Sequence, residues 1–367
     1  MIAIKAIIHV LALFYVINGI MYFIGILILL SRRSKGKLGS NETPMVSVIV
    51  PARNEATTIK LCLESLLSQE YPTEKLQIIA VNDGSIDETQ DILEEVAHTS
   101  SNMKTVHITR DDCIGKLHAL DEGIQKASGE IIVTTDADVE VGKNWVLQMV
   151  NQFNTKTGIV MGMTVDKYTF SPLMAFQALD GAGIRVVSAV LALFKFPITC
   201  QGANLAFRKA AYMQVRESVL HLGKTKGNRE WLLQEVKNET DWGIMPIVHP
   251  HSFGITQSPS TWSGMINQRS RWASTGKNYS SVLVKIYLGL IFMSILSFIS
   301  IIFILPVPEA AHILLVKGII DFSVALGVVT IIQQPILILA FPIAFILQPI
   351  FIIISGILGT LNLYKWK

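Results

Sequence analysis

The chain has 367 residues, of which 50% are hydrophobic and 16% are charged, a balance too apolar for an ordinary soluble enzyme. Its formal net charge of +3 is too small to indicate nucleic-acid binding, and no basic tract with interleaved aromatic residues is present. Its cysteines, Cys62, Cys113 and Cys200, are widely spaced without a C-x-x-C pair, which argues against a disulfide framework or a zinc site.

The hydrophobic excess is concentrated at the two ends of the chain, and the first end predicts a membrane helix. Residues 6–30 carry no charge and are long enough to cross a bilayer. The basic cluster at residues 31–37 follows, and the positive-inside rule places it in the cytoplasm. A cleaved signal peptide is the alternative, but its charge would precede the apolar run and this run is too long.

The second apolar end predicts further membrane segments. Residues 283–305, 312–332 and 336–361 are apolar, and proline-containing segments separate them. Lys317 and Asp321 lie four residues apart in the second segment and are expected to pair. Four spans in all would place the C-terminal lysines outside, against the positive-inside rule, so one segment is expected to be interfacial or re-entrant. The prediction is one N-terminal and two to three C-terminal transmembrane helices.

The middle of the chain alternates between strand and helix patterns. Strands are expected at residues 45–51, 76–81, 105–109 and from 131, with helices starting near residues 57, 88 and 115. This β-α repetition predicts an α/β domain with a parallel sheet wrapped by helices. Further along, we expect helices at 144–153 and 262–275 and strands at 158–165 and 244–249. Residues 171–194 are mostly apolar with few charges, a pattern typical of a core helix or of an amphipathic helix on the membrane surface. We favour the helix on the membrane surface.

Carboxylates follow directly after three of these strands: Glu55, Asp83, Asp136 and Asp138. The carboxyl ends of parallel strands share one edge of the sheet, where such folds bind nucleotides. Asp136 and Asp138 suit a hard divalent cation shared with substrate phosphates. Each acid alone is equally typical of a turn or a helix cap. Together, and with Lys116 at a helix start, they favour a nucleotide site.

Five segments, in this order, resemble motifs of the family 2 glycosyltransferases. They are residues 48–55, 81–85, 115–120 and 135–138, and Gln268-Arg269-Ser270-Arg271-Trp272, which is similar to the family's Gln-x-x-Arg-Trp motif. The resemblance covers about residues 44–275. It implies a glycosyltransferase-A fold that binds a nucleotide sugar, usually UDP-linked, together with Mg²⁺ or Mn²⁺.

The resemblance also implies roles for individual residues on the donor side. Asp83 would hydrogen-bond the base, and Glu55 would lie near the nucleoside, in a motif that also contributes Pro51 and Arg53. Asp136 would face the ribose or diphosphate, Asp138 would ligate the metal, and Lys116 would lie near the nucleotide.

On the acceptor side, the resemblance points to a Gly-x-Asn strand and to the Gln-x-x-Arg-Trp helix. Asn204 belongs to the first and would border the acceptor. Gln268, Arg271 and Trp272 fall on one helix face. Arg271 is suited to clamp a diphosphate, and Trp272 to stack on a sugar or line the acceptor channel. An amphipathic helix against the membrane is the alternative, and it is compatible with that role.

The general base is where this chain departs from the family pattern. Relatives carry Gly-Asp-Asp, whereas this chain has Asn228 and Arg229 after Gly227. Neither side chain accepts a proton from an alcohol near neutral pH. Glu230 is the nearest carboxylate and is the predicted catalytic base, although it is equally typical of an exposed helix residue. Glu239 and Asp241 are the reserve candidates.

These observations predict a metal-dependent, inverting glycosyltransferase in the cell (inner) membrane. The expected division is a transmembrane helix at 1–30, a basic linker at 31–44, a cytoplasmic glycosyltransferase domain at 45–281 and a C-terminal transmembrane region at 282–367. The apolar region favours a lipid or membrane-bound acceptor. A processive polysaccharide synthase ranks second because three C-terminal segments are few for a pore. A non-catalytic nucleotide-sugar-binding subunit is supported by the missing aspartates, and a small transporter is weakly supported.

Overall fold

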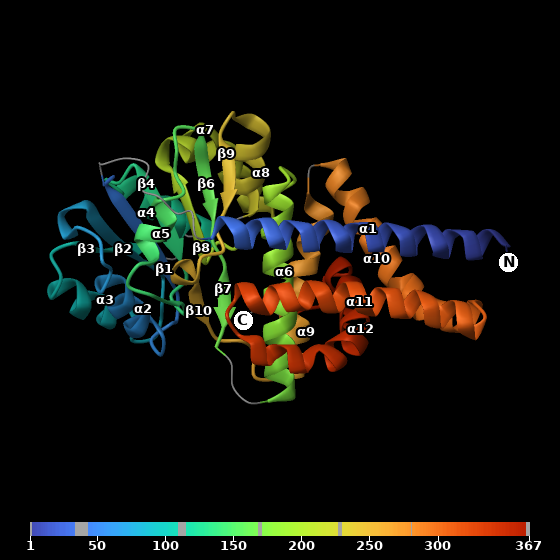
Figure 1. Cartoon of the computed structure of the whole chain (residues 1–367). Coiled ribbons are helices and arrows are strands. Elements are labelled where there is room, and N and C mark those ends of the chain that lie inside the picture. Colours follow the sequence, from blue (N-terminus) through green and yellow to red (C-terminus); the bar gives the residue numbers. More distant parts are fainter. Residues whose placement is uncertain are drawn as a thin grey trace. The chain divides into compact units, whose positions relative to one another are not determined.

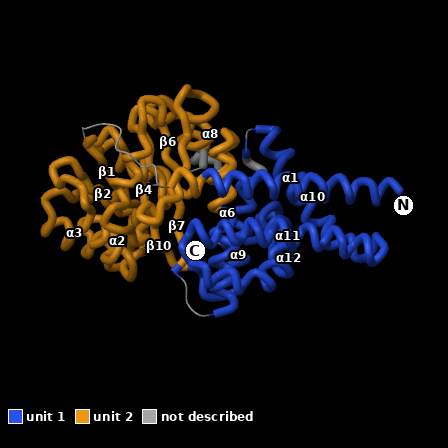
Figure 2. The backbone as a smooth tube through the Cα atoms, in the orientation of Figure 1, with its two compact units in different colours: residues 1–28, 167–184, 258–367 blue, residues 29–166, 185–257 orange. Residues whose placement is uncertain are grey.

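The computed structural model describes residues 2–33, 43–108, 115–167, 171–226, 230–279 and 281–364, with the backbone alone described at residues 223–226, 230, 231, 277 and 278. The chain forms two compact units (Figure 2). The sheet unit comprises residues 29–166 and 185–257, and the helical unit comprises residues 1–28, 167–184 and 258–367.

The sheet unit is built on a seven-stranded sheet in the order β3-β2-β1-β4-β8-β6-β9 (Figure 1). The strands are β1 (Val46–Ala52), β2 (Leu76–Asp83), β3 (Met103–Ile108), β4 (Ile131–Thr135), β6 (Thr157–Met161), β8 (Asn204–Arg208) and β9 (Gly243–Pro246). β3, β2, β1 and β4 are parallel, as predicted, but β8 runs antiparallel to both β4 and β6. The sheet is therefore mixed rather than wholly parallel. The apolar pattern of a strand marks its position but carries no information on its direction.

Helices cover both faces of this sheet because the central strands are apolar on both sides. Along β1, Val48 and Val50 pack in one core and Ile49 packs in the other, since successive side chains point to opposite faces. The first core includes side chains from α2 (Ile59–Leu67), α3 (Thr89–His98) and α5 (Trp145–Val150). The second includes side chains from α4 (Lys116–Lys126), α7 (Lys209–Lys226) and α8 (Glu230–Glu239).

The strand expected at 158–165 is two strands that belong to two different sheets. β6 ends at Met161, and β7 (Thr164–Asp166) joins a small sheet of order β5-β10-β7 with β5 (Glu140–Val141) and β10 (Gly254–Thr256). Gly162 lies at the break, where an added Cβ would collide with the side-chain amide of Asn204. The sequence conceals this break because β-branched residues lie on both sides of it.

The burial of α6 (Pro172–Leu193) favours the core helix over the membrane-surface helix that we expected. In the 18-residue window that qualifies it as a candidate span, 78% of the residues are buried. Its polar residues Gln177, Asp180 and Arg185 are buried as well, and each makes a hydrogen bond. In the sequence, these residues look like the polar face of an interfacial helix.

The helical unit contains the long apolar helices. They are α1 (Ile2–Arg32), α10 (Val282–Ile304), α11 (Val307–Ile331) and α12 (Phe341–Thr360), the last preceded by the 3-10 helix η5 (Pro335–Ala340). With α6, these make five candidate membrane spans among the described residues, three of them C-terminal. The spans in α1, α10 and α11 are only 28% buried, as expected of helices whose apolar faces meet lipid. The shorter α9 (Trp262–Ser274) belongs to this unit too.

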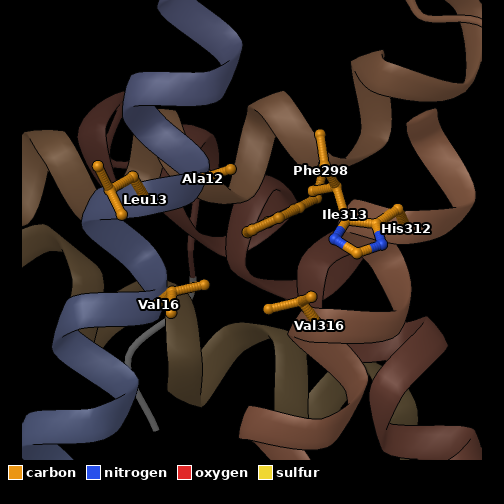
Figure 3. Close-up of a pocket in the computed structure, with 7 residues that line it drawn as sticks. All are labelled: Ala12, Leu13, Val16, Phe298, His312, Ile313 and Val316. Carbon is orange, nitrogen blue, oxygen red and sulfur yellow. The ribbon is translucent and has the colours of Figure 1, made fainter.

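A buried ion pair within α11 is hydrogen-bonded to α1. Lys317 pairs with Asp321 within α11, as predicted, and Lys317 is only 3% exposed. The hydroxyl of Tyr15 in α1 donates to Asp321 Oδ1 at 2.8 Å. Ionisable groups between apolar helices are costly unless paired, so this pair stabilises the contact between α1 and α11. A pocket of about 160 Å³ lies between α1, α10 and α11 and is lined by apolar side chains and His312. Figure 3 shows the side chains that line it.

We predict that Asp121→Asn destabilises the sheet unit by about 1–3 kcal/mol, because it removes a buried charge that joins α4 to α7. Asp121 accepts hydrogen bonds from Tyr212 and Arg216 at 2.7 Å each. Burial would raise the pKa of Asp121, but these donors outweigh burial and lower the pKa.

The folded-state pKa of Asp121 therefore lies below the unfolded value of about 3.9. The stabilisation should be complete above that unfolded value and should be lost as the pH falls through the folded pKa. Urea unfolding at several pH values measures the difference between wild type and variant. The exposed Glu95→Gln on α3 is the control, and equal stability of Asp121→Asn and wild type at pH 7 would contradict the prediction.

Candidate active site

The predicted donor-side carboxylates lie at one edge of the large sheet. β1 lies between β2 and β4 and is parallel to both, with Ala52 opposite Asn82. The carboxyl ends of the three strands are therefore neighbours. Asp83 ends β2 and is 4% exposed, whereas Glu55, Asp136 and Asp138 lie just beyond strand ends and are half-buried. This arrangement brings four acidic side chains to the edge where open α/β sheets bind ligands.

Lys116 adds a positive charge to this edge. It is the first residue of α4, and Gly115 before it has φ 96°, a backbone conformation that favours glycine. Lys116 Nζ lies 2.6 Å from Asp136 Oδ2, and its side chain is 49% exposed. The pair contributes little to stability at that exposure, but it places an ammonium group beside the acids.

The loops after β1 and β2 are held together by hydrogen bonds. Asn54, at φ 55°, donates its backbone N–H to Ser85 Oγ and accepts from the Ile86 N–H on its side-chain oxygen, at 3.1 and 2.9 Å. The Glu55 N–H donates to Thr89 Oγ1 at 2.8 Å, and Glu55 Oε2 accepts from Thr58 Oγ1 at 2.9 Å. These bonds give the Glu55 side chain a defined place relative to the end of β2.

Asp87 is a residue of this edge that the sequence analysis did not single out. Its carboxylate accepts from the Ala56 N–H at 3.2 Å and from the Thr89 N–H and hydroxyl at 3.1 and 2.6 Å. Burial would raise the pKa of Asp87, but the hydrogen bonds it accepts from Thr89 and Ala56 lower the pKa below its ordinary value. The Asp-x-Thr spacing before a helix was the available signal, typical of an Asx turn.

Three further residues near this edge of the sheet, Pro51, Arg53 and Cys62, differ in burial and in contacts. Pro51 is buried in β1, beyond the part of β1 that pairs with β4, so its missing N–H interrupts no ladder there. Arg53 is exposed. The buried Cys62 thiol donates to the Asp136 carbonyl at 3.4 Å, and its pKa is raised by burial and then by Asp138 and Asp136. Cys62 is therefore an inert thiol close to these two carboxylates.

Asn204 is fully buried, and its side chain joins three parts of the sheet unit. Its amide nitrogen donates to the carbonyls of Met163 and Ser252, both at 2.7 Å, and its amide oxygen accepts from Trp145 Nε1 at 3.1 Å. These bonds anchor the segments that lead into β7 and β10. Its predicted place beside the acceptor stays a prediction.

The structure describes the backbone around the predicted base but not its side chain. Glu230 is the first residue of α8, while Asn228 and Arg229 lie outside the described residues. The reserve candidates Glu239 and Asp241 are exposed at the end of α8 and after it. The assignment of the base stays a prediction.

Gln268, Arg271 and Trp272 lie on α9, in the helical unit, and all three are half-buried. The predicted helix is confirmed. Gln268 Oε1 accepts from Arg269 Nη1 at 3.0 Å, and the guanidinium carbon of Arg269 lies 4.3 Å from the centroid of a Trp272 ring. Gln268 and Trp272 therefore both contact Arg269, which was not among the predicted site residues.

Residues 47–211 match the family model described as "Glycosyl transferase family 2", a range that contains every donor-side residue named above. This match covers less than half of the chain, and within residues 47–211 the chain is similar to the family 2 glycosyltransferases.

Several curated proteins are similar to this chain. The "Probable glycosyltransferase YdaM" of Bacillus subtilis (strain 168) is 28% identical over 251 residues, which are 65% of this chain and 57% of that protein. The "Beta-monoglucosyldiacylglycerol synthase" of Synechocystis is 25% identical over 252 residues (64% and 48%). The "Poly-beta-1,6-N-acetyl-D-glucosamine synthase" of Staphylococcus epidermidis is 29% identical over 234 residues (63% and 54%). The chain spans about half the length of the curated relatives it matches.

A solved structure confirms the predicted glycosyltransferase-A fold. The mannosyltransferase PcManGT from Pyrobaculum calidifontis, solved in complex with GDP-Man and Mn²⁺, aligns with a TM-score of 0.54 at 18% identity. The alignment covers 92% of this chain and 99% of that one. At this identity, the likeness shows the fold and not the activity.

The donor chemistry at the sheet edge fits a divalent cation shared with a substrate. Within the described part of the chain, no group of three or more His, Cys, Asp or Glu side chains forms a complete metal site. Asp136 and Asp138 nevertheless supply two carboxylates at one strand end. Mg²⁺ is commonly held by one or two carboxylates together with substrate phosphates, so this pair suits a cation whose coordination a substrate diphosphate would complete.

We predict that Asp87→Ala loosens the loops after β1 and β2. Each lost hydrogen bond is worth about 0.5–1.5 kcal/mol, so the amide hydrogens of Ala56 and Thr89 should exchange about tenfold faster. Hydrogen–deuterium exchange with peptide mass spectrometry measures this effect. Asp91→Ala, which removes an exposed acid of α3, the helix that follows Asp87, is the matched control. Unchanged exchange in Asp87→Ala would show that Asp87 does not hold the loops.

Proposed function

We propose that this protein is an inverting glycosyltransferase that moves a sugar from a nucleotide sugar, UDP-linked, to a lipid or membrane-bound acceptor. The observation that carries the proposal is the group of acids at the shared edge of β1, β2 and β4, with Lys116 beside them, in a chain whose residues 47–211 match the glycosyl transferase family 2 model.

The donor side of the proposed reaction uses residues of the sheet unit. Asp83 and Glu55 would hold the nucleoside, and Asp136 and Asp138 would hold Mg²⁺ or Mn²⁺ with the diphosphate. When bound, the ion supplies charge stabilisation for the departing diphosphate. Lys116 would add a fixed positive charge where negative charge develops. The Mn²⁺ and GDP-Man in the PcManGT structure support a metal and a nucleoside diphosphate sugar, while UDP rests on the resemblance of the motifs.

The acceptor is proposed to be a lipid because much of the chain is built to lie in a membrane. The long apolar helices of the helical unit leave many large hydrophobic side chains exposed. The relative named beta-monoglucosyldiacylglycerol synthase supports a glycolipid product. The relative named poly-beta-1,6-N-acetyl-D-glucosamine synthase supports the second candidate, a processive polysaccharide synthase.

One assay separates these functions. The purified full chain is incubated with a panel of nucleotide sugars and a lipid extract, and nucleoside diphosphate release is measured while the products are identified by mass spectrometry. A lipid carrying one sugar supports the proposal, and a long polymer supports the synthase. Nucleotide-sugar binding without release for any donor or acceptor would favour a non-catalytic binding subunit.

We predict that Asp138→Ala lowers transfer by about 10²–10⁴-fold, because loss of a metal ligand removes several kcal/mol of transition-state stabilisation. The variant should also bind Mn²⁺ more weakly in the presence of UDP, as measured by electron paramagnetic resonance. Asp91→Ala is the control for loss of an acidic side chain. Full turnover of the wild type in EDTA would contradict metal dependence.

We predict that Glu230→Gln lowers transfer by about 10²–10⁴-fold while leaving UDP affinity nearly unchanged, because the isosteric amide cannot accept a proton. Initial rates give the transfer, and titration calorimetry gives the affinity. Wild-type turnover that this substitution leaves intact would move the base to Glu239, Asp241 or another group.

We also propose that the sheet unit lies in the cytoplasm, because four basic residues follow the first apolar run within residues 32–37. In a background without native cysteines, Ser40→Cys should resist an impermeant thiol reagent in intact cells. Ala3→Cys, at the other end of α1, should react. Labelling of Ser40→Cys but not of Ala3→Cys would reverse the orientation.

A further inference from the structure

Arg269 is the buried residue at the centre of the motif Gln268-Arg269-Ser270-Arg271-Trp272. It lies on α9 and is 8% exposed. A guanidinium is always charged in proteins, and burying it is costly unless every face of the group finds a partner. The groups that contact the Arg269 guanidinium therefore indicate the role of this residue.

The guanidinium of Arg269 is fixed by an acid on another helix. Its Nε donates to Asp180 Oδ2 on α6 at 2.8 Å, and Asp180 is 7% exposed. Gln348 of α12 donates to the other oxygen of Asp180 at 3.4 Å. The acid thus has polar contacts on two helices, so the orientation of the Arg269 plane follows from the packing of α6, α9 and α12.

The remaining contacts of Arg269 go to two residues of the motif. Its Nη1 donates to Gln268 Oε1 at 3.0 Å, and its carbon lies 4.3 Å from the centroid of a Trp272 ring. Gln268 and Trp272 are half-buried, and such side chains have several rotamers open to them on a helix surface. A rigid planar group that hydrogen-bonds one side chain and stacks on the other favours one rotamer of each.

The helix that carries this cluster is itself held closely. An added Cβ on Gly359 of α12 would collide with the Ser270 carbonyl of α9, so the two backbones touch. The rings of Phe176, Trp262 and Phe351 join α6, α9 and α12, with centroids 5.3 to 6.0 Å apart. Hydrophobic packing already joins these helices, and a buried ion pair is weak evidence for added stability. The distinctive effect of the Arg269–Asp180 pair is therefore the conformation that it imposes on Gln268 and Trp272.

We propose that Arg269, oriented by Asp180, is a positioning residue that sets Gln268 and Trp272 in the conformation required for sugar transfer. The proposal rests on the proposed function and on the roles predicted from the sequence, in which Arg271 clamps the diphosphate and Trp272 stacks on a sugar or lines the acceptor channel. Neither Arg269 nor Asp180 touches substrate in this proposal. Both act through Gln268 and Trp272.

The kinetic test compares Arg269→Lys and Asp180→Asn with Asp321→Asn. Arg269→Lys keeps the positive charge but loses the planar guanidinium, and Asp180→Asn removes the acid that orients this guanidinium. Asp321→Asn is the control, because it breaks another buried ion pair of the helical unit. We expect kcat to fall about 10–100-fold in the first two variants, with the donor KM within about threefold of wild type, because a small misplacement affects the reacting geometry. Asp321→Asn should retain its kcat.

A double-mutant cycle distinguishes positioning from plain stabilisation. In the Gln268→Ala/Trp272→Ala background, Arg269→Lys should lower kcat by less than about twofold, because the side chains that it positions are gone. An undiminished further loss in that background would contradict the proposal. So would full activity of Arg269→Lys and Asp180→Asn in a protein whose wild type turns over.

A measurement that needs no turnover completes the test. The protein is labelled with 5-fluorotryptophan, and the ¹⁹F resonance of Trp272 is assigned by its loss in Trp272→Phe. Arg269→Lys should shift or split this resonance, and Asp321→Asn should leave it in place. An unchanged Trp272 resonance in Arg269→Lys would overturn the positioning role even where no donor is turned over. Absence of turnover by the wild type with every donor would count against the proposed function alone.

Discussion

The parallel pairing of β1 with both β2 and β4 is the constraint on which the candidate active site depends. Both edges of β1 are occupied by backbone hydrogen bonds, and its side chains are buried on both faces of the sheet. A strand that is apolar on both faces requires helices on both, and each helix must be reached by a loop at the same end of the sheet. Those loops carry Glu55, Lys116, Asp136 and Asp138. The polar edge is thus a geometric consequence of the apolar core.

Buried ion pairs have a different part in the helical unit. Lys317 with Asp321, and Arg269 with Asp180, lie on helices that are apolar or well packed, and each pair is mostly buried. Removal of one partner would leave an uncompensated charge in an apolar environment, so each pair restricts the packing of its helices. Apolar contacts alone permit helices to rotate or slide with little loss, whereas a buried charge accepts only the arrangement that supplies its partner.

The predicted site residues were accessible from the sequence to different degrees. Glu55, Asp83, Asp136, Asp138 and Lys116 follow strands or open a helix, and this local pattern is enough to place them at one edge. Asp87, Asn204 and Arg269 are different, because what they do depends on partners elsewhere in the fold. Asn204, for example, bonds Met163, Ser252 and Trp145 from three separate segments. A short polar residue in a strand pattern gives no indication of that.

The sequence by itself determined the strand–helix alternation, the acids at the strand ends and the long apolar helices. These features depend on periodicity and composition within short windows, which local backbone geometry dictates. Only the tertiary structure decided that β8 runs antiparallel, that the segment after β6 breaks at Gly162, and that α6 is a buried helix. Each of these outcomes depends on which distant segment supplies the hydrogen bonds and apolar surface. No local pattern records that choice, because the same polar residue is stable on a solvated face or beside a buried partner.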